Sequence, residues 1–147
     1  MEFDLQAITE EWVKDAEINE LDLADAARAT PRLHAKYLSK LSFAKLHLQR
    51  LSIRYDKMRG NRYRYYRGEM SKDELVKYSW TQWQGNKPIK SEMDEFLKGD
   101  DELKKIEELI NYQAVIVSTL ESILKGISSR GWDVRTTLDA KKFYNGG

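Results

Sequence analysis

The chain has 147 residues, of which 33% are charged and 41% hydrophobic, with a formal net charge of +1 and no cysteine. This length and composition favour a single soluble, folded domain, and the lack of cysteine excludes disulfides, a thiol nucleophile and Cys-ligated metals. No apolar run approaches the ~18 residues of a membrane span, and the acidic first residues are typical of neither a signal nor a transit peptide, so we expect a cytoplasmic protein.

The charge is strongly segregated along the chain. Residues 1–27 carry nine acids and one base, whereas residues 28–68 carry twelve Lys or Arg and a single acid, Asp56. A segment with a net charge of +11 repels itself unless a polyanion or an acidic segment lies against it. Nucleic acid and the chain's own N-terminus, or that of a neighbouring subunit, are both possible partners.

The first half of the chain is predicted to be helical. Residues 5–17 form an amphipathic pattern, and residues 22–29 suggest a second helical piece. Thr30 and Pro31 are typical of an N-cap and a first helical residue, so a long helix is expected to start at Pro31 and run to about Met58. Gly68 is expected to end any continuation. The helix carries a seven-residue apolar repeat, typical of packing along another helix: Tyr37, Leu41, Ala44, Leu48, Leu51, Tyr55 and Met58.

The second half predicts two short helices and a long one. Ser71 and Glu74 form a capping box, residues 80–88 indicate a loop, and Ser91 is a candidate cap for a helix through Leu97. Asp100 or Asp101 then opens an apolar repeat that continues to Ile127.

Gln113 is the single polar member of that repeat, a position that often sets the register of paired helices. Gly131 is expected to end the long helix, with a short terminal helix over residues 132–144. The fold class is therefore all-α, with long antiparallel helices and short flanking helices. It divides into an acidic segment 1–30, a basic helix 31–70, a segment of short helices and a loop 71–99, and a C-terminal segment 100–147.

The segment 54–68 combines cations with aromatic rings. Guanidinium groups grip phosphates, and tyrosine rings provide stacking platforms for unpaired bases, so the combination favours single-stranded nucleic acid. The alternative is that the tyrosines pack in the core and the arginines pair with acids. A second basic stripe, at helical spacing, favours a polyanion track over an ordinary solvated face or a membrane-surface helix: Lys36, Lys40, His47, Arg50, Arg54 and Lys57.

Catalysis is not predicted. The chain has no phosphate-binding glycine motif, and His34 and His47 lack partners at metal-ligand spacing, so we expect no metal and no cofactor. The alternatives to a DNA-binding protein are a helical adaptor that docks an acidic partner through the basic helix, or an RNA-binding module. The apolar positions near the C-terminus are either core or oligomer contacts: Leu120, Leu124, Ile127, Trp132, Val134, Leu138 and Phe143.

From about Tyr37 onwards the chain resembles the UvsY family, the recombination mediator proteins of T-even-like bacteriophages. Few residues match the family, but they keep the family's spacing over two blocks. The matching residues are Leu38, Lys40, Ser42, Lys45, Arg50, Arg62, Tyr65, Tyr66 and Gly68, then Lys90 to Met93, Leu97, Ser129 to Trp132, Asp139 and Phe143. The family's Lys-Ala-Arg-Leu DNA-binding motif falls on Gly60 to Tyr63, where Arg62 keeps the arginine and Gly60 replaces the lysine.

The resemblance implies sequence-independent binding of single-stranded DNA and assembly into a ring of six or seven subunits through the C-terminal region. It also implies loading of a RecA-like phage recombinase onto DNA coated by the phage single-strand-binding protein, in the cytoplasm of the infected host, without a cofactor or reaction. The residues expected at DNA are Lys40, Lys45, Arg50, Arg54, Lys57, Arg59, Arg62, Tyr63, Arg64, Tyr65, Tyr66 and Arg67.

Overall fold

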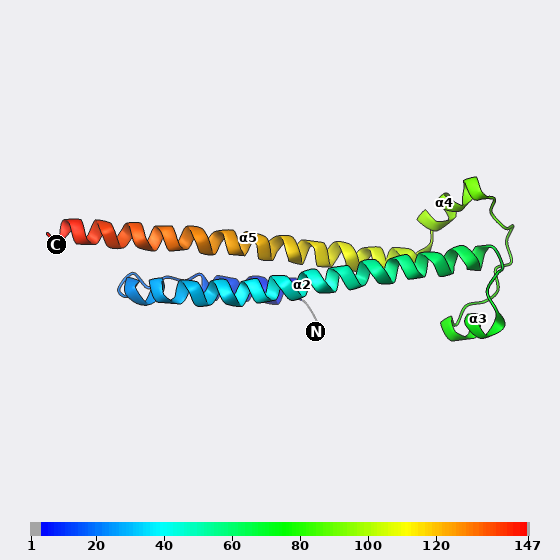
Figure 1. Cartoon of the computed structure of the whole chain (residues 1–147), viewed down its shortest axis with the longest axis horizontal. Helices are drawn as coiled ribbons and strands as arrows, with labels where there is room; N and C mark the ends of the chain where they lie inside the picture. Colours follow the sequence, from blue (N-terminus) through cyan, green and yellow to red (C-terminus); the bar gives the residue numbers. More distant parts are fainter. Residues whose placement is uncertain (1–3, 147) are drawn as a thin grey trace. The chain divides into compact units, whose positions relative to one another are not determined.

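A computed structural model describes residues 4–146 and confirms the all-α fold class, since no strand occurs among them. It contains five helices (Figure 1): α1 (Leu5–Asp15), α2 (Leu23–Tyr66), α3 (Lys72–Tyr78), α4 (Lys90–Lys98) and α5 (Asp101–Tyr144). The ring assembly expected from the resemblance stays a prediction.

The N-terminal helix α1 forms where an amphipathic helix was predicted. The Asp4 carboxylate caps it by accepting from the backbone N–H groups of Gln6 and Ala7. Ile8 is buried, and the Trp12 ring meets the Tyr37 ring edge to face at a centroid distance of 5.5 Å. Val13 is 61% exposed, so the apolar face is narrower than its pattern suggests.

The helix start predicted at Thr30 and Pro31 is wrong, because α2 begins eight residues earlier and contains Pro31. Asp22 supplies the start, since its carboxylate accepts from the N–H of Asp25 at 3.0 Å. Leu23 and Ala26 are both buried, and their packing outweighs the backbone hydrogen bond that Pro31 cannot donate. The Thr30 hydroxyl donates to the carbonyl of Ala26, four residues earlier.

The predicted end of α2 is partly confirmed. The helix runs past Met58 and through Gly60 to Tyr66, and Gly68 follows with a φ of 70°, the left-handed conformation typical of a residue that ends a helix. The capping box of Ser71 and Glu74 is present at the start of α3, and residues 80–88 contain no helix. The predicted cap at Ser91 is wrong, because α4 begins at Lys90 after Ile89.

The long helix α5 begins as predicted and ends later than predicted. Asp100 caps it by accepting from the N–H of Leu103 at 3.0 Å. Gly131 does not end the helix, and no separate terminal helix exists over residues 132–144. The buried side chain of Val134 gives the helix a reason to continue beyond Gly131.

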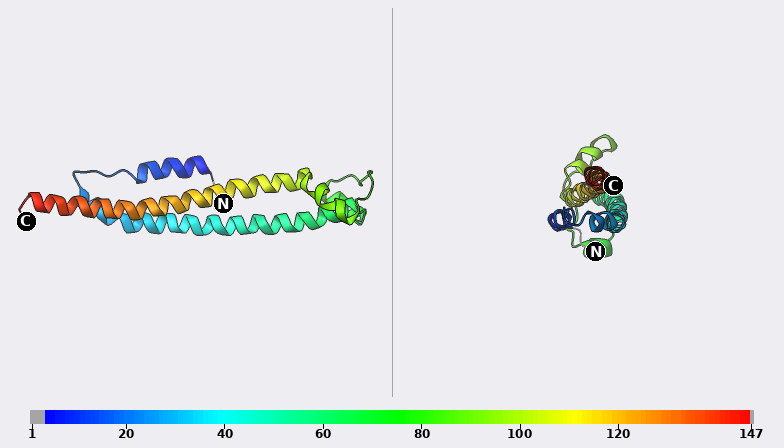
Figure 2. Two further views of the ribbon diagram at one scale, coloured as in Figure 1. Left: turned by 90° about the horizontal axis from the view of Figure 1, so that it is seen from above. Right: turned by 90° about the vertical axis from the view of Figure 1, so that its left-hand side faces the viewer.

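The chain divides into two compact units, whose boundaries differ from those of the four segments expected from the sequence. The first unit holds the described residues up to His47 and those from Gln113 onwards. In it α2 and α5 are antiparallel, because Gln113 Nε2 donates to the carbonyl of Ala44 at 3.0 Å while Gly131 lies against Thr30. Figure 2 shows α1, in dark blue, running alongside these helices.

The core of the first unit includes several predicted interface positions. Leu120, Ile127 and Val134 are at most 2% exposed, so they pack within the subunit. Trp132 and Phe143 are 68% and 81% exposed and remain available for contacts between subunits. Leu124 and Leu138 are half-buried.

The second unit, Leu48–Tyr112, holds the end of α2, helices α3 and α4, and the start of α5. Its core is built from Tyr66, Met93, Leu97 and Leu103. Here too α2 and α5 are antiparallel, since Tyr55 donates to Glu107 and Arg62 to Asp100.

Candidate nucleic-acid interface

Three exposed cations of the second unit form a row on α2. Arg50, Arg54 and Lys57 are spaced by four and three residues, which places them on one side of the helix. At about 100° per residue, this side lies well away from the apolar repeat that packs inward. None of the three has a carboxylate within ion-pair distance among residues 4–146. The row, which we call the open cationic row, is therefore free to take an anion.

Two neighbouring arginines have surface carboxylate partners. Arg59 lies 3.5 Å from Asp94, and Arg67 lies 2.9 Å from Glu69. Exposed ion pairs of this kind contribute at most about 1 kcal/mol each, so a phosphate can displace the carboxylate.

Arg64 is held more firmly, by the capping box of α3. Its two terminal nitrogens donate to both carboxylate oxygens of Glu74, at 2.6 and 2.7 Å. These hydrogen bonds, with that from the Ser71 N–H, lower the pKa of Glu74 to about 2. The arginine is thereby tied to α3, although its side chain remains 40% exposed.

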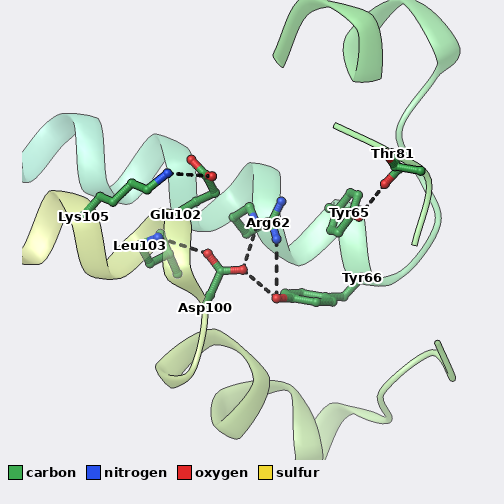
Figure 3. A network of polar contacts seen from close by, with 8 residues as sticks. All are labelled: Arg62, Tyr65, Tyr66, Thr81, Asp100, Glu102, Leu103 and Lys105. Carbon is green, nitrogen blue, oxygen red and sulfur yellow. Dashed lines mark hydrogen bonds and ion pairs between the residues drawn. The ribbon is translucent and has the colours of Figure 1, made fainter. Parts of the chain in front are cut away.

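Arg62 belongs to a buried polar network (Figure 3). Its Nε donates to Asp100 Oδ2 at 2.7 Å, and the Tyr66 hydroxyl donates to the same oxygen at 2.6 Å. The Asp100 side chain is fully buried, and that of Arg62 is 11% exposed. Burial and the nearby charge of Asp100 both raise the pKa of Tyr66. For Arg62, burial acts to lower the pKa, but the hydrogen bond to Asp100 acts to raise it, and the net result is a raised pKa.

The predicted stacking tyrosines lie mainly in an aromatic cluster around Arg62. Its guanidinium carbon lies 4.2 Å from the ring centroid of Tyr65 and 4.5 Å from that of Trp80. Tyr65 also donates to the carbonyl of Thr81, and the buried Tyr66 meets Trp83 edge to face. Tyr63 is half-buried against the same core, with Arg67 6.0 Å from its ring.

The loop between α3 and α4 packs as a wedge against this cluster. Trp80 stacks on Tyr78 at 4.6 Å, while Trp83 donates to the carbonyl of Asn86. A side chain at Gly85 would overlap the Trp83 ring, so the loop needs glycine there. The two tryptophans are thus packing residues in this structure.

The remaining expected DNA contacts, Lys40 and Lys45, lie in the first unit. Lys40 Nζ is 3.4 Å from Glu11, and Lys45 Nζ is 4.0 Å from Glu121. The structure therefore does not bring the predicted residues together as one uniform surface. It separates exposed cations from cations engaged by the chain's own acids.

Sequence reasoning missed the role of Asp100, although one signal was present. Two steps of four from Met58, the last residue of the apolar repeat, reach positions 62 and 66, which places Arg62 and Tyr66 on the inward side of α2. A buried arginine needs a carboxylate partner, and Asp100 supplies it.

The described residues contain neither a cluster of metal ligands nor a membrane-spanning helix. In that part of the chain no group of three His, Asp or Glu side chains is placed to hold a metal ion. None of the helices over residues 4–146 is long and apolar enough to cross a membrane.

The chain matches known proteins along nearly its whole length. A family model described as "Recombination, repair and ssDNA binding protein UvsY" matches residues 11–147. The recombination protein UvsY of Enterobacteria phage T4 is 27% identical over 142 residues, covering 97% of this chain and 98% of that protein.

Solved structures agree with this match. One crystal structure of the bacteriophage T4 recombination mediator protein UvsY (lattice type II) is 25% identical, with a TM-score of 0.82 over 98% of this chain and 99% of that one. Another crystal form (lattice type I), also 25% identical, gives 0.79 over 94% and 98%. The resemblance inferred from the residues is confirmed, and the chain belongs to the UvsY family of recombination, repair and single-stranded-DNA-binding proteins.

Proposed function

We propose that this protein is a recombination mediator that binds single-stranded DNA without sequence preference. It helps to load a RecA-like phage recombinase onto DNA coated with single-strand-binding protein, in the cytoplasm of the infected host. The family description and the T4 relatives support the general role. Binding and positioning, rather than a chemical step, then carry the function.

The open cationic row is the observation that carries this proposal. Arg50, Arg54 and Lys57 are exposed, and the structure gives them no acidic partner among residues 4–146. Contacts from such side chains to phosphates carry no sequence information, so they suit a protein that must act on any strand. Arg59 and Arg67 extend the surface once phosphate replaces their surface carboxylates. Arg62 and Tyr66 contribute by holding this end of α2 in place.

Assembly multiplies the weak contact of one subunit. Subunits associate as a ring of six or seven copies through exposed apolar side chains of α5, such as Trp132 and Phe143. A strand bound by one open cationic row then meets the next at high effective concentration. Held by its backbone, the strand has bases free for the recombinase to nucleate on, in competition with the coat protein.

Removing the open cationic row tests the proposal. We expect Arg50→Gln, Arg54→Gln and Lys57→Gln together to weaken binding of oligodeoxythymidine and mixed-sequence strands alike. The slope of log K against log salt should become shallower by about 2 per engaged subunit, at ~0.7 per phosphate contact. Fluorescence anisotropy at several salt concentrations measures both quantities, and the lag before recombinase filaments form on coated DNA should lengthen.

The matched control removes three exposed cations elsewhere in the same unit. Lys72→Gln, Lys77→Gln and Lys104→Gln change the net charge equally. An equal loss in the control would show a general charge effect and contradict the assigned surface. If an RNA strand competes as well as DNA, the RNA-binding alternative is favoured.

A further inference from the structure

In the first unit, two lysines of α2 are occupied by carboxylates of α1. Lys36 Nζ lies 2.6 Å from Glu11 Oε1 and 2.6 Å from Asp15 Oδ2. Lys40 Nζ lies 3.4 Å from Glu11 Oε2. Three carboxylate oxygens from one short helix thus meet two ammonium groups one helical turn apart.

These contacts lie at the surface, except that the Asp15 side chain is 25% exposed and also accepts from the hydroxyl of Tyr37 at 2.9 Å. The side chains of Lys36 and Lys40 are 37% and 34% exposed, and that of Glu11 is 40% exposed. Hydrogen bonding to Lys36 lowers the pKa of Glu11, so the carboxylate is charged at neutral pH. Exposed ion pairs of this type are weak and screened by salt, which means that another anion can compete for the lysines.

The attachment of α1 does not depend on these ion pairs alone. Ile8 is buried, and Trp12 packs on Tyr37 from α2 and lies close to Gly126 of α5. Lys141 also donates to the carbonyl of Glu20 in the linker that follows α1. The acidic side chains can therefore release the lysines while α1 stays in place.

We propose that Lys36 and Lys40 form a second binding site for the phosphates of single-stranded DNA, which Glu11 and Asp15 keep covered until a strand displaces them. The inference rests on the proposed function, because it assumes that the protein engages a strand. The ligand chemistry follows from the contact itself: the lysines already hold oxygens of an anion, and a phosphodiester offers the same oxygens. Because a ligand must first displace Glu11 and Asp15, the site favours a strand that is already held elsewhere on the molecule over anions that bind weakly and briefly.

The experiment removes the cover without removing the lysines. Glu11→Gln with Asp15→Asn keeps oxygen acceptors for the Lys36 and Tyr37 donors but removes both charges. We expect about fivefold tighter binding of labelled oligodeoxythymidine at low salt, from two exposed charge pairs. The slope of log K against log salt should steepen by about 1.4, since two further phosphates are engaged.

Two further variants isolate the site. Glu10→Gln with Glu17→Gln makes the same charge change at exposed acids that have no ion pair among residues 4–146. It should give a clearly smaller gain and no steeper slope. Adding Lys36→Gln and Lys40→Gln to the uncovered variant restores the original net charge and should abolish the gain. Circular dichroism should show unchanged helix content in every variant.

The other possible results would each overturn one or both proposals. An equal gain in the Glu10 and Glu17 control, or a gain that survives loss of Lys36 and Lys40, would overturn the second site. An equal gain towards polyglutamate would assign the lysines to an acidic protein segment and would also overturn it. Failure of the open cationic row test, with the uncovered variant still gaining affinity, would reject the proposed surface and keep this one. If no form of the protein binds a strand, both proposals fail.

Discussion

Arg54 and Arg62 lie eight residues apart on one helix but have different environments. Arg54 is exposed and has no acid within ion-pair distance in the described part of the chain, whereas Arg62 is paired with the buried carboxylate of Asp100. A cation can attract a distant phosphate only if its charge is not already neutralised nearby. The two arginines therefore have different roles, one facing outward and the other stabilising the second unit.

The buried pair leads to a prediction about stability. Asp100→Asn leaves the Arg62 guanidinium without its counter-charge, so the free energy of unfolding should fall by about 3 kcal/mol. Urea denaturation at fixed protein concentration measures this change. Asp101→Asn, one residue later and exposed, is the matched control and should cost less than about 1 kcal/mol. Similar losses in the two variants would contradict the structural role of the pair.

At the scale of the element, the repeat of apolar residues could predict the pairing of α2 with α5, but not where these helices begin and end. Local preferences favour a helix start at Pro31 and a helix end at Gly131. The buried side chains of Leu23, Ala26 and Val134 lie beyond these boundaries and keep the helix going. Tertiary packing determines where α2 begins and where α5 ends, and a single sequence does not reveal that packing.

The site was predictable to a similar extent. The exposed face of Arg50, Arg54 and Lys57 follows from helical spacing alone. The partner of Arg62 does not follow from helical spacing, because Asp100 reaches Arg62 only through the turn that joins α4 to α5. Spacing within one helix is visible in the sequence, whereas contacts between distant segments depend on the fold.

The short helix α3 gives a prediction about pH. The pKa of Glu74 is about 2 in the folded protein, against an ordinary value of 4.5. A lowered folded-state pKa stabilises the structure above pH 4.5, and this stabilisation is lost as the pH falls towards 2. Carboxyl NMR titration should show Glu74 charged at pH 3. Glu74→Gln should remove its share of the acid-induced loss, and a Glu74 midpoint near 4.5 would contradict the pairing with Arg64.

Gly60 gives a prediction about the stability of α2. It lies in the helix with nothing within 4 Å of where a Cβ would stand. Gly60→Ala should raise the free energy of unfolding by about 1 kcal/mol, because glycine is the poorer helix former. Chemical denaturation measures the gain, and no gain would indicate that the helix is interrupted there.

The resemblance noted in the sequence also implies that Gly60 stands where the family's Lys-Ala-Arg-Leu motif has its lysine. Gly60→Lys should tighten strand binding and steepen the salt slope by about 0.7, whereas Gly60→Gln should stabilise the helix without changing the slope. The comparison separates added charge from added helix stability.

At the scale of the whole molecule, the proposed ring depends on apolar side chains that the subunit itself does not bury. Phe143 and Tyr144 are 81% and 85% exposed, and their rings contact each other. Phe143→Ser with Tyr144→Ser should lower the native mass measured by light scattering and weaken DNA binding through lost avidity. Val76→Ser, which alters a 77% exposed residue of α3, should leave the mass unchanged. An unaltered mass in the double variant would place the subunit contacts elsewhere.

The amide of Gln113 has a consequence for how the antiparallel helices of the first unit match. Aliphatic side chains interlock almost as well after a slide of one turn, so leucine and isoleucine alone leave several alignments close in energy. The amide nitrogen, 2% exposed as part of its residue, finds its acceptor at the carbonyl of Ala44. A slipped alignment would leave that donor unpaired and away from water at a cost of about 1–3 kcal/mol, so roughly one molecule in six or fewer would adopt it. One uncharged side chain thus selects a single alignment from several nearly equivalent ones.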